Sequence, residues 1–164
     1  MNLSTLILLA ASICPAQEPS KDELIKKDLA KIQGDWRLTA MEQNGAKSEE
    51  NPTGPGTLFR VSGTKYSTRS GTESWQELGE LKLDPTQKPK AMDATFGEGE
   101  RKELAKASYE IEGDKLRVAY LREERMGGAD AVFSDERPKD FKMKPVEDKK
   151  EPHLRVLYFE RVKK

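Results

Sequence analysis

The chain has 164 residues, a length typical of one domain, and its 29 basic and 29 acidic side chains give a formal net charge of zero. Proteins that bind nucleic acid or membrane surfaces through charge concentrate Lys and Arg, so this balance argues against both kinds of partner. Charged residues and hydrophobic residues each make up 35% of the chain, which indicates a modest core under a heavily charged surface.

The first sixteen residues stand apart because they carry no charged side chain. Their apolar run, Leu6 to Ile13, is too short to span a bilayer and is typical of a signal peptide, 1–16, cleaved after Ala16. A lipid anchor on Cys14 is the alternative, although Ile13 is larger than the residue that lipidation prefers before the cysteine. We therefore expect an exported protein of the periplasm, cell envelope or exterior, with no transmembrane span and no cysteine in the mature chain.

An N-terminal helix is expected within 17–33. Ser20 and Glu23 form a capping-box pattern, and apolar residues then recur at helical spacing as far as Ile32. Gly34 follows as a stop, so the pattern predicts about three helical turns over 21–33.

From Gly34 onward the apolar period changes to two, which predicts strands. Asn44-Gly45, Gly63-Thr64 and Gly113-Asp114 are signals for tight hairpins. The expected strands begin at Trp36 and continue over 57–62, 65–70, 73–84, 91–96, 107–112, 115–121, 140–144 and 154–162. Eight or nine sequential strands after one helix predict an all-β, antiparallel up-and-down domain over 34–164 that closes into a barrel or splits into two sheets. Closure would remove exposed edges, which favours the barrel.

The last expected strand is apolar on both faces. Leu154, Val156 and Tyr158 share one face, and Leu157 and Phe159 share the other. A strand of this kind is covered on both sides. We expect one face to point into the barrel and the N-terminal helix to cover the other.

Two segments resemble the lipocalins. Gly34-Asp35-Trp36 opens the first strand after the helix, and Arg161 lies in the last strand. In lipocalins, a tryptophan at this place plugs the closed end of the barrel, and an arginine from the last strand packs across the indole, a favourable contact between a cation and an aromatic face. The resemblance therefore implies a structural barrel-end group made of Gly34, Trp36 and Arg161.

From about Asp28 to Lys163 the chain also resembles an uncharacterised lipocalin-like domain family of exported planctomycete proteins. The resemblance rests on LAKIQGDWRLTAMEQNG, LKLDPTQKPKAMD, YEIEGDKLRVAY, ERPKDF and LYFER, in this order. It implies a lipocalin-like barrel and no established activity. The charged segment 122–138 is longer than this family leads us to expect.

Asp93 and Arg137 are the first candidate ligand contacts. Asp93 alternates with the apolar Met92 and Ala94, and Pro138 holds Arg137 extended. Each residue either ties a loop to a strand through hydrogen bonds or a salt bridge, or contacts a ligand at the mouth of a cavity. A further hypothesis is that the two residues pair with each other. An Arg137→Ala variant with unchanged stability and ligand uptake would leave both without a role.

Trp75 and Tyr120 are the other candidates. With Tyr66 and Tyr109, they are aromatic residues at alternating strand positions that either line a lumen or belong to a packed core. An eight-stranded barrel accommodates both, because its interior is either filled by side chains or open to one small ligand.

The residue inventory does not predict catalysis. His153 is the only histidine and lies in a polar turn, so we expect it on the surface, and no G-x-S-x-G turn is present. Metal-ligand spacing is not recognisable, and the carboxylates are too numerous to single out a catalytic pair. We expect no catalytic, cofactor-binding or metal-binding residue.

Two functional hypotheses remain ahead of an enzyme. The first is an exported monomer that binds a small, partly apolar molecule inside or at the mouth of the barrel. The alternative is a protein-interaction, inhibitor or structural module of the cell envelope, with a filled barrel and binding loops at 43–56 and 122–139. A connected apolar cavity of about 300 Å³ or more would favour the first hypothesis, and a solid interior would favour the second.

Overall fold

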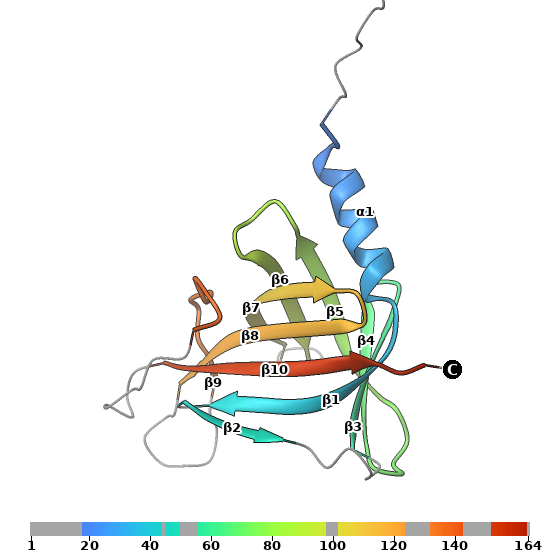
Figure 1. The fold of residues 1–164 in the computed structure, drawn as a ribbon, viewed down its shortest axis with the longest axis vertical. Helices are drawn as coiled ribbons and strands as arrows, with labels where there is room; N and C mark the ends of the chain where they lie inside the picture. The colour runs from blue at the N-terminus through green and yellow to red at the C-terminus, as the bar shows by residue number, and fades with distance from the viewer. Residues whose placement is uncertain are drawn as a thin grey trace, which may run out of the picture.

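The structure is a computed structural model that describes residues 18–43, 45–49, 56–97, 102–123, 132–142 and 152–163. The expected signal peptide, 1–16, lies outside these residues. Within the described residues, one helix precedes ten strands, and Figure 1 shows their arrangement. Their bounds are α1 Lys21–Ile32, β1 Gly34–Gln43, β2 Ala46–Glu49, β3 Thr57–Ser62, β4 Lys65–Ser70, β5 Gln76–Asp84, β6 Lys90–Phe96, β7 Glu103–Glu112, β8 Lys115–Glu123, β9 Val132–Phe133 and β10 His153–Arg161.

Eight of the strands form a closed antiparallel barrel. Strands β3 to β8 pair in chain order, and β1 pairs with both β3 and β10 while β10 pairs with β8, so that the ring is complete. The two remaining strands are additions, since β2 pairs with β1 and β9 pairs with β8. The prediction of an all-β, up-and-down barrel with one N-terminal helix is confirmed.

The helix begins and ends as its sequence predicts. The Ser20 side chain accepts a hydrogen bond from the Glu23 amide at 3.3 Å, and the Glu23 carboxylate accepts one from the Ser20 amide at 2.8 Å. After the helix, the Gln33 carboxamide both donates to the Gly63 carbonyl and accepts from the Gly63 amide, which fixes the β3–β4 turn against the helix end. Gly34 has φ +100°, a conformation that glycine adopts without strain, and it turns the chain into β1.

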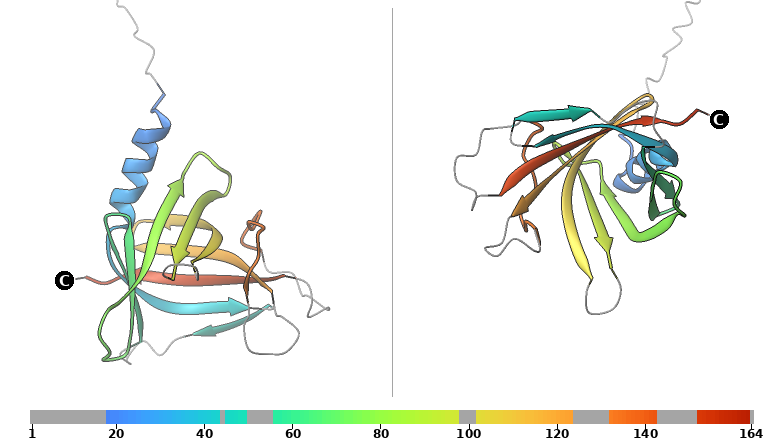
Figure 2. Two further views of the ribbon diagram at one scale, coloured as in Figure 1. Left: turned by 180° about the vertical axis from the view of Figure 1, so that it is seen from behind. Right: turned by 90° about the horizontal axis from the view of Figure 1, so that it is seen from below.

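The predicted position of the helix is wrong. Instead of covering the outer face of β10, α1 lies over one end of the barrel, at the end where β5 finishes and β6 begins (Figure 2). Gln33 alone separates α1 from β1, so the helix has no length of chain with which to reach the outer wall. Its fully buried Ile32 enters the core, and Lys21 pairs with Asp84 at 2.8 Å.

The outer wall has a different cover, the segment that follows β9. The Ser134 amide donates to the Leu121 carbonyl at 3.0 Å, and the Ser108 hydroxyl donates to the Pro138 carbonyl at 2.8 Å. Ser108 and its cross-strand partner Ala119 are fully buried although both lie on the outward face. A segment that is polar in sequence therefore packs against the barrel wall.

Three strand assignments differ from the prediction. Strand β2 lies within 43–56, a segment expected to be a loop. Residues 140–142 of the expected strand at 140–144 are not in a strand, and 143–144 lie outside the described residues. Conversely, Val132 and Phe133 form the short strand β9 within a segment expected to be a loop. Two residues are too few to produce a period-two pattern. The Phe133 ring nonetheless packs against Phe96 and Tyr120, with centroids 4.9 and 5.4 Å away.

Candidate functional site

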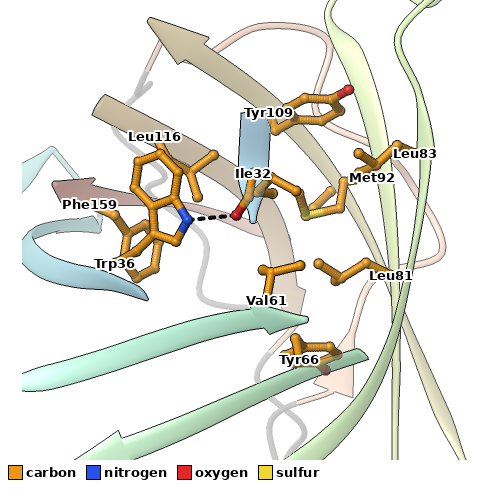
Figure 3. Close-up of a cluster of buried hydrophobic side chains, with 11 residues drawn as sticks. Ile32, Trp36, Val61, Tyr66, Leu81, Leu83, Met92, Tyr109, Leu116 and Phe159 are labelled. Carbon is orange, nitrogen blue, oxygen red and sulfur yellow. Dashed lines mark hydrogen bonds between the residues drawn. The ribbon is translucent and has the colours of Figure 1, made fainter. Parts of the chain in front are cut away.

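The helix end of the barrel is closed by Trp36. This side chain is fully buried, and its Nε1 donates to the Ile32 carbonyl at 2.7 Å (Figure 3). Trp36 and Arg161 are partners in the β1–β10 ladder, and the guanidinium carbon lies 4.1 Å from the centroid of the Trp36 ring system. The structure thus brings together the two residues that the lipocalin resemblance singled out.

Arg161 also binds the end of the helix. Its Nη1 donates to the Gln33 carbonyl at 2.7 Å and its Nη2 to the Lys31 carbonyl at 2.5 Å. The last carbonyls of a helix have no partner within the helix, and a guanidinium is suited to satisfy them. Gly34, between the helix and Trp36, would place an added Cβ 3.6 Å from Nη1 of Arg161. The three residues therefore form one closed end.

A buried carboxylate joins the helix to the barrel. Asp28 is 3% exposed and accepts hydrogen bonds from Lys90 Nζ at 2.6 Å and from the Tyr109 hydroxyl at 3.0 Å. Burial alone would raise the pKa of Asp28, but the hydrogen bonds from Lys90 and Tyr109, with the charges of Lys90 and Lys31, lower this pKa below its usual value. Burial and the Asp28 charge raise the pKa of the fully buried Tyr109. Asp28 and Tyr109 are therefore buried groups whose polar atoms have partners within the protein.

The other half of the barrel contains a cavity of about 300 Å³. Every strand of the ring contributes to its lining, as does β9, and the described lining residues are apolar except for two threonines and two tyrosines. Representative lining residues are Phe59, Leu78, Ala94, Phe96, Tyr120 and Leu157.

Small side chains explain why space remains in this half. Ala94 pairs with Ala105 and Met92 with Ala107 across β6 and β7, and all four line the cavity. The helix half instead holds the largest fully buried side chains, among them Trp36 and Tyr109. One barrel therefore combines a packed end and a hollow end, both of which eight-stranded barrels allow.

Of the four candidate ligand contacts, Tyr120 lines the cavity and Trp75 does not. The Trp75 ring lies on the outer side of the wall, where the guanidinium carbons of Arg60 and Arg69 are 3.9 and 5.0 Å from its centroid. The cause is an irregularity in β5: Ser67 pairs with Glu77 and Tyr66 with Gly79, so the residue between them is extra.

An extra residue in a strand reverses the alternation of faces beyond it. Trp75 and Leu81 are an even number of residues apart in sequence, but because of the extra residue they lie on opposite faces of the wall. Leu78 is the extra residue, and its side chain lines the cavity. Gly79 is required next to it, because an added Cβ would lie 1.8 Å from the Thr95 carbonyl oxygen.

Asp93 and Arg137 bind each other, and neither is among the described residues that line the cavity. Arg137 donates from Nη2 to the Asp93 carboxylate and from Nη1 to the backbone carbonyls of Met92, at 3.0 Å, and Ala107. The guanidinium thus fastens the segment after β9 to both β6 and β7. These contacts match the first of the two interpretations, a loop tied to strands.

The sequence analysis missed three basic residues at the hollow end. His153, expected on the surface, is 4% exposed and begins β10, where it pairs with Arg122 of β8. Two residues further along β10, Arg155 pairs with Tyr120. Leu157 lines the cavity, so counting back in steps of two puts Arg155 and His153 on the same inward face. The sequence alone was sufficient to predict this alternation of inward and outward residues.

A second hollow, of about 760 Å³, lies on the outer surface and is lined by residues of β1, β2, β7, β8 and β10. Its described lining residues include four basic and four acidic side chains: Arg37, Lys47, Lys115, Arg117, Glu49, Glu110, Glu112 and Glu160. Because the two signs balance, this groove does not select a ligand of either charge.

No protein-family model, curated protein or solved structure matches the chain. The barrel itself is consistent with a lipocalin-like fold. Within the described residues, no helix is long and apolar enough to cross a membrane, and no group of three or more His, Cys, Asp or Glu side chains is placed to hold a metal ion.

Proposed function

We propose that this protein is an exported, lipocalin-like, non-catalytic binding protein that holds one small, partly apolar molecule inside its barrel. The observation that carries the proposal is the apolar cavity of about 300 Å³ in the half of the barrel away from the helix. Pockets of this size and composition are typical of small-molecule sites. Membership of the exported lipocalin-like family is part of the proposal, supported by the matching segments and by the contact between Trp36 and Arg161.

The lining indicates how such a ligand would be held. Thr57, Thr68 and the two tyrosines are the polar residues in an otherwise apolar wall, so burial of apolar surface would supply most of the affinity. The rings of Phe59, Phe96 and Tyr120 would set the shape of ligand that fits.

The alternative, a protein-interaction module with a filled barrel, has less support. A cavity bounded by Ala94, Ala105 and Ala107 is not a filled interior. The loops that this alternative invokes, 43–56 and 122–139, include residues 44, 50–55 and 124–131, which lie outside the described residues.

The test uses N-phenyl-1-naphthylamine, a neutral dye that fluoresces in apolar sites. Wild-type protein is expected to bind one dye molecule with micromolar affinity. Ala94→Phe places a ring in the cavity and is expected to abolish the signal, with little loss of stability because the ring enters existing space. The matched control is Leu104→Phe on β7, where the native side chain is 43% exposed and the dye should still bind.

Two results would contradict the proposal. One is the absence of saturable dye binding to folded wild-type protein. The other is equal dye binding by the Ala94→Phe and Leu104→Phe variants, which would place the dye outside the barrel.

A further inference from the structure

We propose that the molecule held in the barrel carries a carboxylate, bound by Arg155 and His153 at the end of the cavity away from the helix. This inference rests on the proposed function and names the chemical class of the ligand: a compact apolar body that ends in an anion.

The ladder between β8 and β10 places both residues beside the cavity. Arg155 is directly opposite Tyr120, whose side chain lines the cavity, and Leu157, two residues along β10, lines it as well. Directly opposite residues in an antiparallel pair share a face, and so do residues two apart on one strand. Arg155 therefore lies on the inward face, and His153 follows on the same face toward the strand end.

Burial leaves both side chains with unused hydrogen-bonding atoms. Nδ1 of His153 and Nε of Arg155 are buried, and neither has a hydrogen-bond partner among the described residues. His153 as a whole is 4% exposed. Buried polar atoms in native proteins nearly always have partners, and a buried N–H without one is costly. A ligand that presents an anion at this point would remove that cost.

Among the residues that the structure describes, the surrounding inward positions add positive charge and no negative charge. Gln43 of β1 is directly opposite Arg155, and Arg122 of β8 is directly opposite His153. Glu42 alternates to the outer face, where it accepts a hydrogen bond from the Tyr158 hydroxyl at 2.8 Å. Glu103, at the start of β7, is opposite the cavity-lining Phe96 but is itself exposed.

The geometry selects a carboxylate on an apolar chain or ring. A guanidinium presents parallel N–H groups that match the two oxygens of a carboxylate. The Arg122 guanidinium carbon lies 6.0 Å from the centroid of the Phe133 ring, and Phe133 lines the cavity, so the apolar and cationic surfaces are continuous. A medium-chain monocarboxylate would place its alkyl chain against the apolar surface and its carboxylate against the cationic surface.

The test compares decanoate with 1-decanol, which has the same chain and no charge, as competitors of the naphthylamine dye at pH 7.5. Wild-type protein is expected to bind decanoate at least tenfold more tightly than decanol. Arg155→Met keeps the length of the side chain and removes its charge, and it should reduce decanoate affinity at least tenfold while dye and decanol affinities stay within twofold. Arg117→Met is the control, because Arg117 is on the outer face of β8 and pairs with Glu110.

The outcomes separate this inference from the proposed function. If wild-type protein binds dye and decanol but binds decanoate no more tightly, the carboxylate site is overturned and the apolar site stands. If dye, decanol and decanoate all fail to bind, both proposals fall. Equal loss of decanoate affinity in the Arg155→Met and Arg117→Met variants would also overturn the site. The wild-type comparison needs no substitution, so it decides the matter even if a variant does not fold.

Discussion

Replacing Arg161 with alanine tests whether the guanidinium closes the helix end of the barrel. The substitution removes the hydrogen bonds to the Gln33 and Lys31 carbonyls and the contact with the Trp36 ring. A hydrogen bond to a charged group contributes about 1.5–3 kcal/mol, and the lower value applies here because water can reach part of this site. The cation–aromatic contact adds about 0.5–2 kcal/mol. The ion pair with the half-exposed Asp114 adds roughly 0–1 kcal/mol.

These contributions are not strictly additive, and we expect Arg161→Ala to lower the free energy of unfolding by about 3–5 kcal/mol. Arg161→Lys keeps the cation but loses the fork that reaches two carbonyls, so it should lose roughly half as much. Arg117→Ala is the matched control, since the Arg117 and Glu110 side chains are 36% and 41% exposed, and we expect a loss of about 1 kcal/mol or less.

Urea denaturation followed by tryptophan fluorescence measures all three variants. Amide hydrogen exchange supplies a second readout, because the last turn of α1 should lose protection in Arg161→Ala and keep it in Arg117→Ala. The reasoning is refuted if Arg161→Ala is within 1 kcal/mol of Arg117→Ala, or if it loses stability while the helix keeps its wild-type protection.

Two further predictions concern the ion pairs of Asp28 and Arg137. Because the pKa of Asp28 is lower in the folded state than in the unfolded state, its carboxylate contributes stability that is present above about pH 3.9 and is lost as pH falls through the folded pKa. Asp28→Asn should therefore be less stable than wild type by about 1–3 kcal/mol at pH 7. Urea unfolding measured from pH 7 to pH 3 should show that the difference in free energy of unfolding between the two proteins becomes smaller. A difference that stays constant with pH would contradict this explanation. Arg137→Ala should lower the free energy of unfolding by about 2–3 kcal/mol because it frees the segment after β9, with dye affinity unchanged. Unchanged stability with a tenfold weaker dye affinity would return Arg137 to the cavity mouth.

The parts of the candidate site that were predictable depend on local patterns. The alternation in β8 identifies Tyr120 as an aromatic residue that can face a lumen, and it does line the cavity. The same reasoning fails for Trp75, because the extra residue in β5 lies between it and Leu81, and a bulge leaves no clear mark in an alternating sequence. It also failed for His153, where the polar residues before the strand suggested a turn although the strand parity pointed inward.

The sequence by itself determined the helix and most of the strands. The capping box and the change of period at Gly34 depend on residue type and spacing, which are local properties of the chain. The contact between Trp36 and Arg161 was implied by the resemblance to lipocalins. The tertiary structure alone decided the position of α1 over the barrel end, the fastening of the segment after β9 by Arg137, and the volume left inside. These features depend on which distant strands meet and in what register, and the cavity is the difference between the space that eight strands enclose and the side chains that all of them contribute.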